Sequence, residues 1–539
     1  MRLLTPLRLA AVGLALAVGL VAASCGGGDG GGEGGGGQGA AVAVEIAGAK
    51  LVPASTAVFI SVDTDFESDQ WQAAEALINR FPGGADAFQS LFKAAGREGL
   101  DLETDIKPAF GPETDVAILD LSGDLQSTDN APLVLLTQPT DAAKFEALLA
   151  RGEDQAVFEV AEDGWYLVAD NQAIIDQFRA DAGTAPLADD AAYKAATESL
   201  SGDSFATLYV NGASVTKAFS EQLGAQLGDN PLLGSLNPAA GAAKLISAAV
   251  SLSATDQGVK VEGKVKTEGA PAVQNYTAEL PALAPSGAIV FASFSNLRSG
   301  LEQFLDLVSK QEPDFAQQLG QLELALGLSV QNDVLPLFEG EEAFSVRAGA
   351  PIPEITLLLS PADPQKGLAT LDQLASLGAL AGAGSDGGAS FSATSVDIAG
   401  IPAKKLDLGE SFSLYYAVVG KNLVLTTAES GIAGLAGEAS HLVDDPLFQE
   451  AKQAAGLPDE SLGFVYVNVQ EALTLVQGLG SLADLGSGIL GTGTSGSDVV
   501  SPDVLDPATL ANLAPIQYLL VSASGGDNET TFSGFVGIK

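Results

Sequence analysis

The sequence predicts an α+β fold made of two tandem duplicated units, each an antiparallel sheet with helices packed on one face. Short apolar runs alternate with stretches of helical period along the chain, and this alternation occurs twice. The segment "GVKVEGKVK" (258–266) places Val259, Val261 and Val265 on one face of a strand and charged side chains on the other. One solvated face is typical of an antiparallel sheet.

Pairs of similar segments support the repeat. "DSFATLYVNGASVTKAF" (203–219) aligns with "ESLGFVYVNVQEALTLV" (460–476) without a gap, and "DIKPAFGPE" (105–113) aligns with "DVLPLFEGE" (333–341). The order of the segments is the same in both halves. We therefore expect two copies of one unit.

The first unit is predicted to span 49–279 and the second 280–539. Within each, the elements run strand, helix, two strands, helix, two strands, helices, strand, helix and a final hairpin. Asn211 and Asn468 stand where a strand ends and a helix begins, so we predict that both cap the helix N-terminus.

The net charge of the chain limits the kinds of partner that it can bind. The chain has 539 residues, 46% of them hydrophobic, and carries 68 acidic against 25 basic side chains, a net charge of −43. The hydrophobic content suffices for globular cores. A surface this acidic repels phosphate backbones, so we expect no nucleic-acid partner.

The N-terminus has the three parts of a secretory signal. Arg2 and Arg8 precede a short apolar stretch that ends in the small residues 22–24. Gly-rich sequence follows at once, whereas a membrane-spanning helix needs about 20 apolar residues. Residues 1–24 are therefore predicted to be a signal peptide.

Cys25 is the only cysteine of the chain and directly follows this signal. "VAAS-C" is similar to a bacterial lipobox, although Ala22 stands where leucine is usual. We predict that Cys25 carries the lipid that anchors the protein, because several acyl chains on one residue hold stably to a membrane. The alternative is a plain secretory signal with an incidental cysteine.

Residues 25–48 form the predicted lipidated tether, which is dominated by glycine. Such a segment buries little apolar surface and behaves as a flexible coil with a reach of roughly 25–29 Å. We expect the body to lie outside the cytoplasm, anchored to the outer face of the cell membrane.

One resemblance is specific. "LVPASTAVFISVDTDFESDQWQAAEALINRFPG" (51–83) and the later "YVN" strands resemble an actinobacterial family of secreted lipoproteins that is described only as domain of unknown function 3352. The resemblance covers nearly the whole mature body. It implies export and the duplicated fold, and it brings no activity, ligand or site residues.

The sequence offers few candidate residues for acid–base catalysis. His441 is the single histidine, lies in a polar loop ahead of a helix, and has no counterpart in the first half. As a catalytic base it would need a nucleophile, and the chain has no G-x-S-x-G elbow. We therefore predict no catalytic residues and no enzyme, with a hydrolase as a third alternative.

Two further motifs have simpler interpretations. The acids of "DTDFESD" (63–69) favour the N-terminus of the following helix, with calcium as the alternative, but Ser68 and Ala74 stand where an EF-hand needs Gly and Glu. "GAGSDG" (382–387) matches G-x-G-x-x-G but follows a helix and precedes a strand, the reverse of a dinucleotide site. We predict no metal site and no cofactor.

Two nearly uncharged apolar segments, 232–250 and 473–493, follow the "YVN" strands. The simpler interpretation is a helix and loop packed over the sheet, and the alternative is a lid or lining of an apolar cavity. The predicted function is accordingly binding or scaffolding in the cell envelope, with an envelope protein as partner. The alternative is a carrier of lipid or another apolar ligand in a cavity between sheet and helices.

Overall fold

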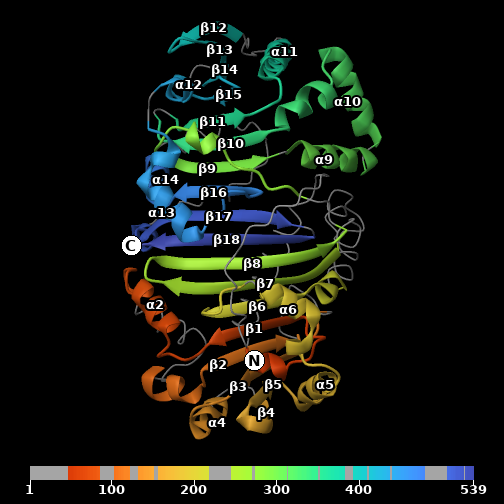
Figure 1. Cartoon of the computed structure of the whole chain (residues 1–539), viewed down its shortest axis with the longest axis vertical. Helices are drawn as coiled ribbons and strands as arrows, with labels where there is room; N and C mark the ends of the chain where they lie inside the picture. The colour runs from red at the N-terminus through yellow and green to blue at the C-terminus, as the bar shows by residue number, and fades with distance from the viewer. Residues whose placement is uncertain are drawn as a thin grey trace. The chain divides into compact units, whose positions relative to one another are not determined.

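The computed structural model describes residues 46–84, 102–121, 131–150, 156–198, 200–217, 244–269, 273–295, 297–311, 313–349, 352–382, 393–408, 412–437, 440–479, 507–526 and 528–539. The chain divides into two compact units (Figure 1). The first comprises 1–273 with 525–533 and 538–539, and the second comprises 274–524 with 534–537. Helices and strands alternate in both, and the strand pairs whose register is described below are all antiparallel.

The strands of the first unit pair in the order β4-β5-β3-β2-β1-β6-β7-β8. The chain runs outward from β1, which pairs with both β2 and β6. The strands are β1 (Val58–Asp63), β2 (Glu113–Ile118), β3 (Leu133–Thr137), β4 (Val157–Val160), β5 (Tyr166–Ala169), β6 (Ala206–Asn211), β7 (Lys244–Thr255) and β8 (Gly258–Glu268).

The helices of the first unit occur at the predicted places between these strands. A helix follows β1, another separates β3 from β4, two lie between β5 and β6, and one turn of helix follows β6 at 212–217. The predicted order of elements is therefore confirmed for this unit. The main helices are α2 (Asp69–Ile78), α4 (Ala142–Ala150), α5 (Gln172–Ala182) and α6 (Ala191–Thr197).

Helices cover both faces of this sheet, so the prediction that helices pack on one face only is wrong. Phe145 and Leu148 of α4 pack on one side, here called the α4 face. Phe178 of α5 and Tyr193 of α6 pack on the other, the α5 face. The reason is that the central strands are buried on both faces: all five residues of β3, four of them apolar, are buried. The apolar–charged alternation from which a solvated face was predicted belongs to β8, away from these central strands.

The strands of the second unit pair in the order β12-β13-β14-β15-β11-β10-β9-β16-β17. β9 takes the central place that β1 has in the first unit, between β10 and β16. The strands are β9 (Ala288–Ser295), β10 (Glu341–Arg347), β11 (Glu354–Leu359), β12 (Ala393–Ile398), β13 (Ile401–Asp407), β14 (Ser413–Val419), β15 (Asn422–Thr426), β16 (Gly463–Asn468) and β17 (Ile516–Gly526). The last strand of the chain, β18 (Glu529–Ile538), is divided between the two units.

The hairpin β12–β13 is an addition that the predicted element order does not contain. Ala399 and Gly400 join its strands, and both have positive φ, 53° and 83°. Two left-handed residues are what a two-residue hairpin turn requires. Four strands therefore separate the flanking helices, where two were predicted.

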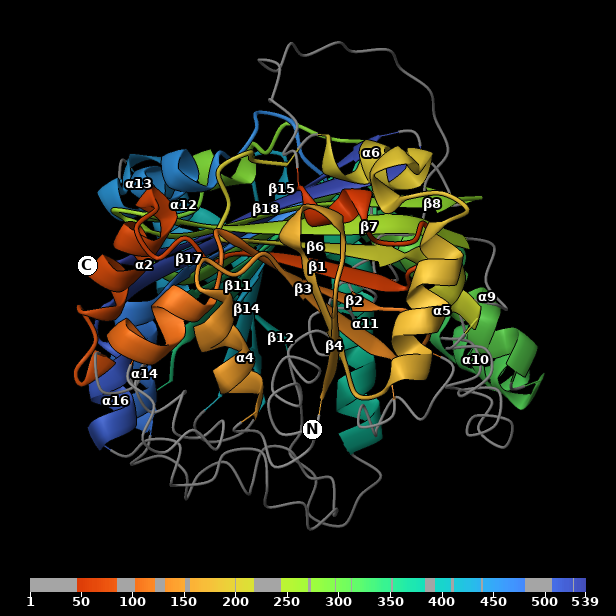
Figure 2. The same ribbon diagram turned by 90° about the horizontal axis from the view of Figure 1, so that it is seen from below.

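Helices flank both faces of the second unit as well. Phe448 of α13 packs with Phe464 and Tyr466 on one side, the α13 face. Leu368 and Leu371 of α11 pack on the other, the α11 face. In Figure 2, α14 lies below β11 and β14 of this unit, and α12 and α13 lie above them. The helices are α9 (Leu297–Gln311), α10 (Pro313–Leu326), α11 (Pro364–Gly382), α12 (Glu429–Ala436), α13 (Pro446–Ala455), α14 (Val469–Leu479) and α16 (Pro507–Leu513).

Candidate functional site

The α11 face carries large apolar side chains that stay accessible to water. Phe344 on β10 is 39% exposed, Ile355 on β11 is 40% exposed and Val521 on β17 is 39% exposed. Phe294 on β9 is similar at 37%. Isolated exposed apolar residues are common, but a contiguous apolar patch marks an interaction surface.

The register shows that these side chains share one face. Phe344 lies directly opposite Ala292 and Leu357, and Val465 lies opposite both Ala292 and Val521. Residues opposite each other in an antiparallel pair point to the same side. A row of apolar side chains therefore crosses five adjacent strands.

Helices with exposed apolar residues border this row. α14 packs against β9 and β16 and exposes Val476. α9 follows β9 and exposes Leu297 and Phe304, and α10 exposes Leu324.

Glu342 is a buried carboxyl on the same face. It lies opposite Phe294 on one neighbouring strand and Leu359 on the other, is 3% exposed, and has no hydrogen-bond partner among the described residues. Burial raises the pKa of Glu342 to about 8, the nearby backbone of Leu297 lowers it, and the charge of Glu341 raises it further. The carboxyl is therefore mostly uncharged at neutral pH.

In the first unit, Thr114 occupies the strand position that Glu342 occupies in the second unit. The hydroxyl of Thr114 has hydrogen-bond partners. Its hydroxyl lies 2.9 Å from Thr64 Oγ1 and 3.1 Å from Thr137 Oγ1. In the second unit Leu359 takes the place of Thr137 and offers no polar partner. A polar cluster in one unit is thus replaced by a lone acid among apolar groups in the other.

In each unit, one glutamate accepts hydrogen bonds from the backbone of the segment that precedes the first strand. The carboxylate of Glu113 accepts the backbone N–H groups of Ala47 and Gly48 at 3.1 and 2.7 Å. That of Glu341 accepts those of Glu279 and Leu280 at 2.7 and 3.1 Å. Both bonds cap the first turn of a 3-10 helix, Gly48–Lys50 or Leu280–Ala282, where free N–H groups favour an anion.

Asp115 lies beside the first of these contacts. It is fully buried, and neither carboxyl oxygen has a hydrogen-bond partner among the described residues. Burial, with the charge of Glu113, raises the pKa of Asp115 well above its usual range. A Cβ added to Gly48 would come within 1.6 Å of Asp115 Oδ2, so glycine is required there. The second unit has Leu280 and Ala343 at these positions.

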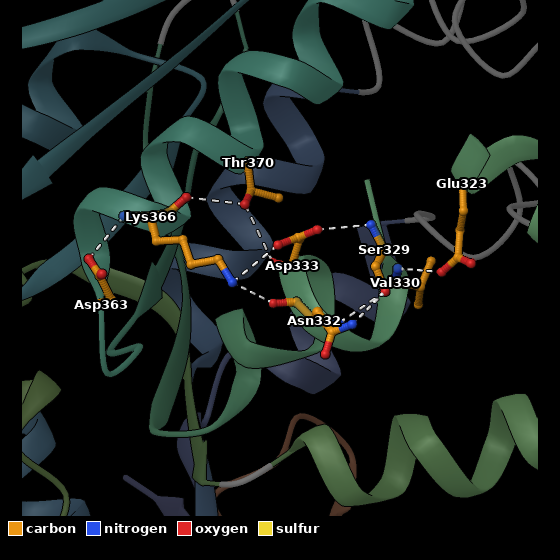
Figure 3. Close-up of polar contacts among 8 residues, drawn as sticks. All are labelled: Glu323, Ser329, Val330, Asn332, Asp333, Asp363, Lys366 and Thr370. Carbon is orange, nitrogen blue, oxygen red and sulfur yellow. Dashed lines mark hydrogen bonds and ion pairs between the residues drawn. The ribbon is translucent and has the colours of Figure 1, made fainter. Parts of the chain in front are cut away.

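The polar cluster of Figure 3 joins α11 to the turn after α10. Lys366 Nζ donates to the backbone oxygen of Asn332 at 2.6 Å and pairs with Asp333 at 3.1 Å. The backbone N–H of Ser329 and the Lys366 ammonium hold the pKa of Asp333 below its usual range. Each charge in this cluster is matched by a neighbour, so we interpret it as a structural brace.

His441 lies ahead of a helix, as we expected, and it is half-buried. It precedes the 3-10 helix Leu442–Asp444, and its backbone N–H donates to Asp444 Oδ2 at 3.3 Å. Its side-chain Nδ1 is buried with no hydrogen-bond partner among the described residues. Pro285 forms an isolated bridge with His441, just as Pro53 does with Pro186 in the first unit.

The other features that the sequence singled out either make structural hydrogen bonds or lie outside the described residues. Asn211 Oδ1 accepts the N–H of Ala213, and Asn468 Oδ1 accepts that of Glu471, both at 3.1 Å, so the predicted helix caps are confirmed. In the acidic stretch 63–69, Asp63 accepts from the Asp65 N–H and the Ser68 hydroxyl. Cys25, the tether and residues 383–387 of the glycine motif lie outside the described residues.

The two apolar segments are only partly described. In 232–250, residues 244–250 belong to strand β7, which corrects the prediction of a helix and loop there. The reason is that Val250 and Ala248 pack in the sheet core of the first unit. In 473–493, residues 473–479 end helix α14 and the remainder lies outside the described residues. Among the helices that the structure describes, none combines the length and hydropathy needed to span a membrane.

Comparisons with known proteins give one informative result. No curated protein matches the chain significantly. Among solved structures, crystal form III of TP0453 covers 40% of this chain and 78% of its own at 10% identity and a TM-score of 0.20. Crystal form I covers 42% and 82% at 10% identity and a TM-score of 0.22. Scores this low carry no argument.

The family comparison covers most of the described body. The model of a protein of unknown function, DUF3352, matches residues 149–483, which include parts of both units. That span is more than half of the 539 residues. The chain therefore belongs to the DUF3352 family of proteins of unknown function.

Proposed function

We propose that this protein works outside the cytoplasm, anchored to the outer face of the cell membrane by a lipid on Cys25. The observation that carries the proposal is the position of the sole cysteine, directly after a signal-like segment and before a glycine-rich tether. The tether would let a body of strongly negative charge stand off an anionic surface.

Replacement of the anchor residue tests this directly. Cys25→Ala should release the protein from the membrane fraction and abolish incorporation of labelled acyl chains. Ser24→Ala is the matched control, because it changes the neighbouring residue and keeps the thiol. Membrane retention of Cys25→Ala would contradict the proposal.

We further propose that the body consists of two tandem copies of one unit. Support comes from the shared place of β1 and β9 between their neighbours, from the paired acids Glu113 and Glu341, and from the two proline bridges. The hairpin β12–β13 is then an insertion in the second copy.

Binding or scaffolding, rather than catalysis, is the activity that we propose for this body. The two acids whose pKa is raised furthest, Asp115 and Glu342, are buried, and His441 Nδ1 faces no hydrogen-bond partner among the described residues. Replacing His441 by Ala should leave any activity measured for the protein unchanged. A loss of activity with the fold intact would favour a hydrolase.

A second candidate function is that of a carrier of an apolar ligand. It is favoured by the row of accessible apolar side chains on the α11 face. Native mass spectrometry of the purified mature chain should show co-purified lipid that Phe344→Asp removes. A ligand-free mass under gentle conditions, unchanged by added lipid, would contradict this function.

A further inference from the structure

The sheet of the first unit ends at β4 in a strand with one unpaired edge. Within the part of the chain that the structure describes, β4 pairs with β5 and with no other strand. The N–H of Ala161 donates to the backbone oxygen of Trp165 at 2.7 Å, so Glu159, two residues earlier, also turns its backbone toward β5. The N–H and C=O groups of Phe158 and Val160 therefore point away from the sheet.

The outward-facing residues of β4 carry exposed apolar side chains. Phe158 is 40% exposed and Val160 is 49% exposed. They lie opposite Val168 and Tyr166 of β5, so both point to the α4 face. Proteins commonly protect a free strand edge with lysine, proline or another charged side chain, and β4 has apolar side chains at these two positions instead.

The one charged side chain of β4 is already neutralised. Glu159 lies opposite Leu167 and points to the α5 face, where Arg179 of α5 pairs with its carboxylate at 3.0 Å. In a chain of net charge −43, this strand with its Arg179 partner therefore carries no net charge. A second strand can approach it without meeting an uncompensated acid.

The end strand of the second unit has a different edge. β12 pairs only with β13 among the strands that the structure describes, and its exposed side chains are small or polar: Ala393, Thr394, Ser395 and Asp397. Lys404 lies opposite Ser395 and donates to its hydroxyl at 3.3 Å. Such an edge is typical of one that is kept from pairing.

We propose that β4 pairs with β4 of a second copy of this chain, antiparallel about a two-fold axis at Glu159. In this register Phe158 of each copy lies opposite Val160 of the other, and the outward-facing groups of both residues form about four backbone hydrogen bonds. The apolar side chains meet on the α4 face. On the α5 face the two Glu159 side chains lie opposite each other, and Arg179 of each copy offsets their repulsion.

A second copy fits this edge better than a strand of another sequence. The partner strand needs apolar side chains opposite Phe158 and Val160 and no added charge opposite Glu159, and β4 with Arg179 meets both conditions. A two-fold contact is also the commonest symmetry of protein oligomers. The contact is small, so the dissociation constant should be on the order of 100 µM. This inference goes beyond the proposed anchor and the proposed carrier function and depends on neither.

Sedimentation equilibrium of the mature chain with Cys25→Ala tests the pairing without the membrane. From about 5 to about 500 µM it should show a reversible equilibrium between monomer and dimer. Val160→Pro removes an N–H that the sheet of the first unit does not use, so the fold should persist and association should weaken about tenfold or more. Phe158→Lys serves if Val160→Pro does not fold, as judged by circular dichroism. Ser395→Pro on β12 is the matched control and should leave association unchanged.

A cross-link tests the register. Directly opposed residues at the axis have Cα atoms about 4.5–5.5 Å apart, a separation that a disulfide can span. In the Cys25→Ala background, Glu159→Cys should therefore form a disulfide-linked dimer on mild oxidation. Val157→Cys should not, because its two copies would be offset by about 14 Å along the strands.

Each outcome bears on the proposal. A chain that stays monomeric over the whole range would overturn it. A dimer that neither Val160→Pro nor Phe158→Lys weakens would overturn it as well, because the contact would then lie elsewhere. Equal cross-linking of Glu159→Cys and Val157→Cys would contradict the two-fold register.

Discussion

The α4 face of the first unit and the α11 face of the second are formed by residues at matching positions in the strand pairing. The side chains of the two faces are exposed to water to different extents. Val116, Leu133 and Val250 on the α4 face are 1%, 0% and 6% exposed. Their counterparts Phe344, Ile355 and Val521 are 39%, 40% and 39% exposed. One pattern of strand pairing therefore gives a closed core in one unit and an accessible apolar surface in the other.

The helix that follows the third strand explains part of the difference. In the first unit, Phe145 and Leu148 of α4 fill the centre of the face. In the second, Ala375 of α11 packs with Leu406 on β13 and Tyr416 on β14, whose hydroxyl donates to Asp372 at 2.8 Å. α11 therefore contacts β13 and β14 here, and through Leu368 and Leu371 it also packs near Leu359 on β11 and Leu423 on β15.

The largest predicted effect is the loss of stability when an aspartate is introduced on one of the two faces. Val116→Asp should lower the free energy of unfolding by about 3–5 kcal/mol, because it buries an unpaired carboxylate. Phe344→Asp should cost less than about 1 kcal/mol, because its side chain reaches water. Urea titration measures both, and equal losses would remove the basis of the comparison.

The pH dependence of stability should reveal Glu342. Its folded pKa is raised to about 8, so the folded state keeps a proton that the unfolded state loses. The free energy of unfolding should therefore fall as pH rises from about 5 to about 8, by roughly 2–4 kcal/mol. Glu342→Gln should remove the part of this fall that Glu342 contributes, leaving that of other raised acids such as Asp115, and Glu339→Gln should leave the whole fall. Identical pH profiles for wild type and Glu342→Gln would contradict the burial of this acid.

Gly48 and Asp115 offer a test of the differences between the two units. Gly48→Ala should destabilise by about 2–3 kcal/mol, since its Cβ would collide with the Asp115 carboxyl. Asp115→Ala should rescue Gly48→Ala, because the second unit holds Leu280 beside Ala343 in the same arrangement. A double-mutant cycle by thermal unfolding measures the coupling, and simple additivity would count against it.

The smallest predicted effect should be the same in both units. Asn211→Ala and Asn468→Ala each remove one cap with a 3.1 Å bond and should each cost about 1 kcal/mol. Helical signal in circular dichroism and urea midpoints would measure the loss. A large loss in one unit alone would show that the caps are not equivalent.

Local patterns sufficed to predict much of the fold. The strand-to-helix junctions at Asn211 and Asn468 were predicted because a cap depends on residues two or three positions away. The element order of the first unit follows from the same short-range periodicity. The hairpin β12–β13 was missed because Ala399 is not a residue type that usually signals a left-handed turn.

Contacts between residues far apart in the chain could not be predicted from the sequence. Glu113 and Glu341 align in "DIKPAFGPE" and "DVLPLFEGE", but their N–H donors lie 65 and 61 residues away. Glu342 and Phe344 alternate along β10 as any amphipathic strand does. Whether such a face is covered depends on where α11 packs, and no local signal states that.

Thiol accessibility measures the central claim most directly, because the body has no cysteine. In a Cys25→Ala background, Phe344→Cys and Val116→Cys each place one thiol at corresponding positions of the two faces. The account predicts that Cys at 344 reacts with a maleimide within about tenfold of a free peptide, whereas Cys at 116 reacts on the order of a thousandfold more slowly, limited by opening of the core. Equal protection of both thiols would contradict an accessible α11 face.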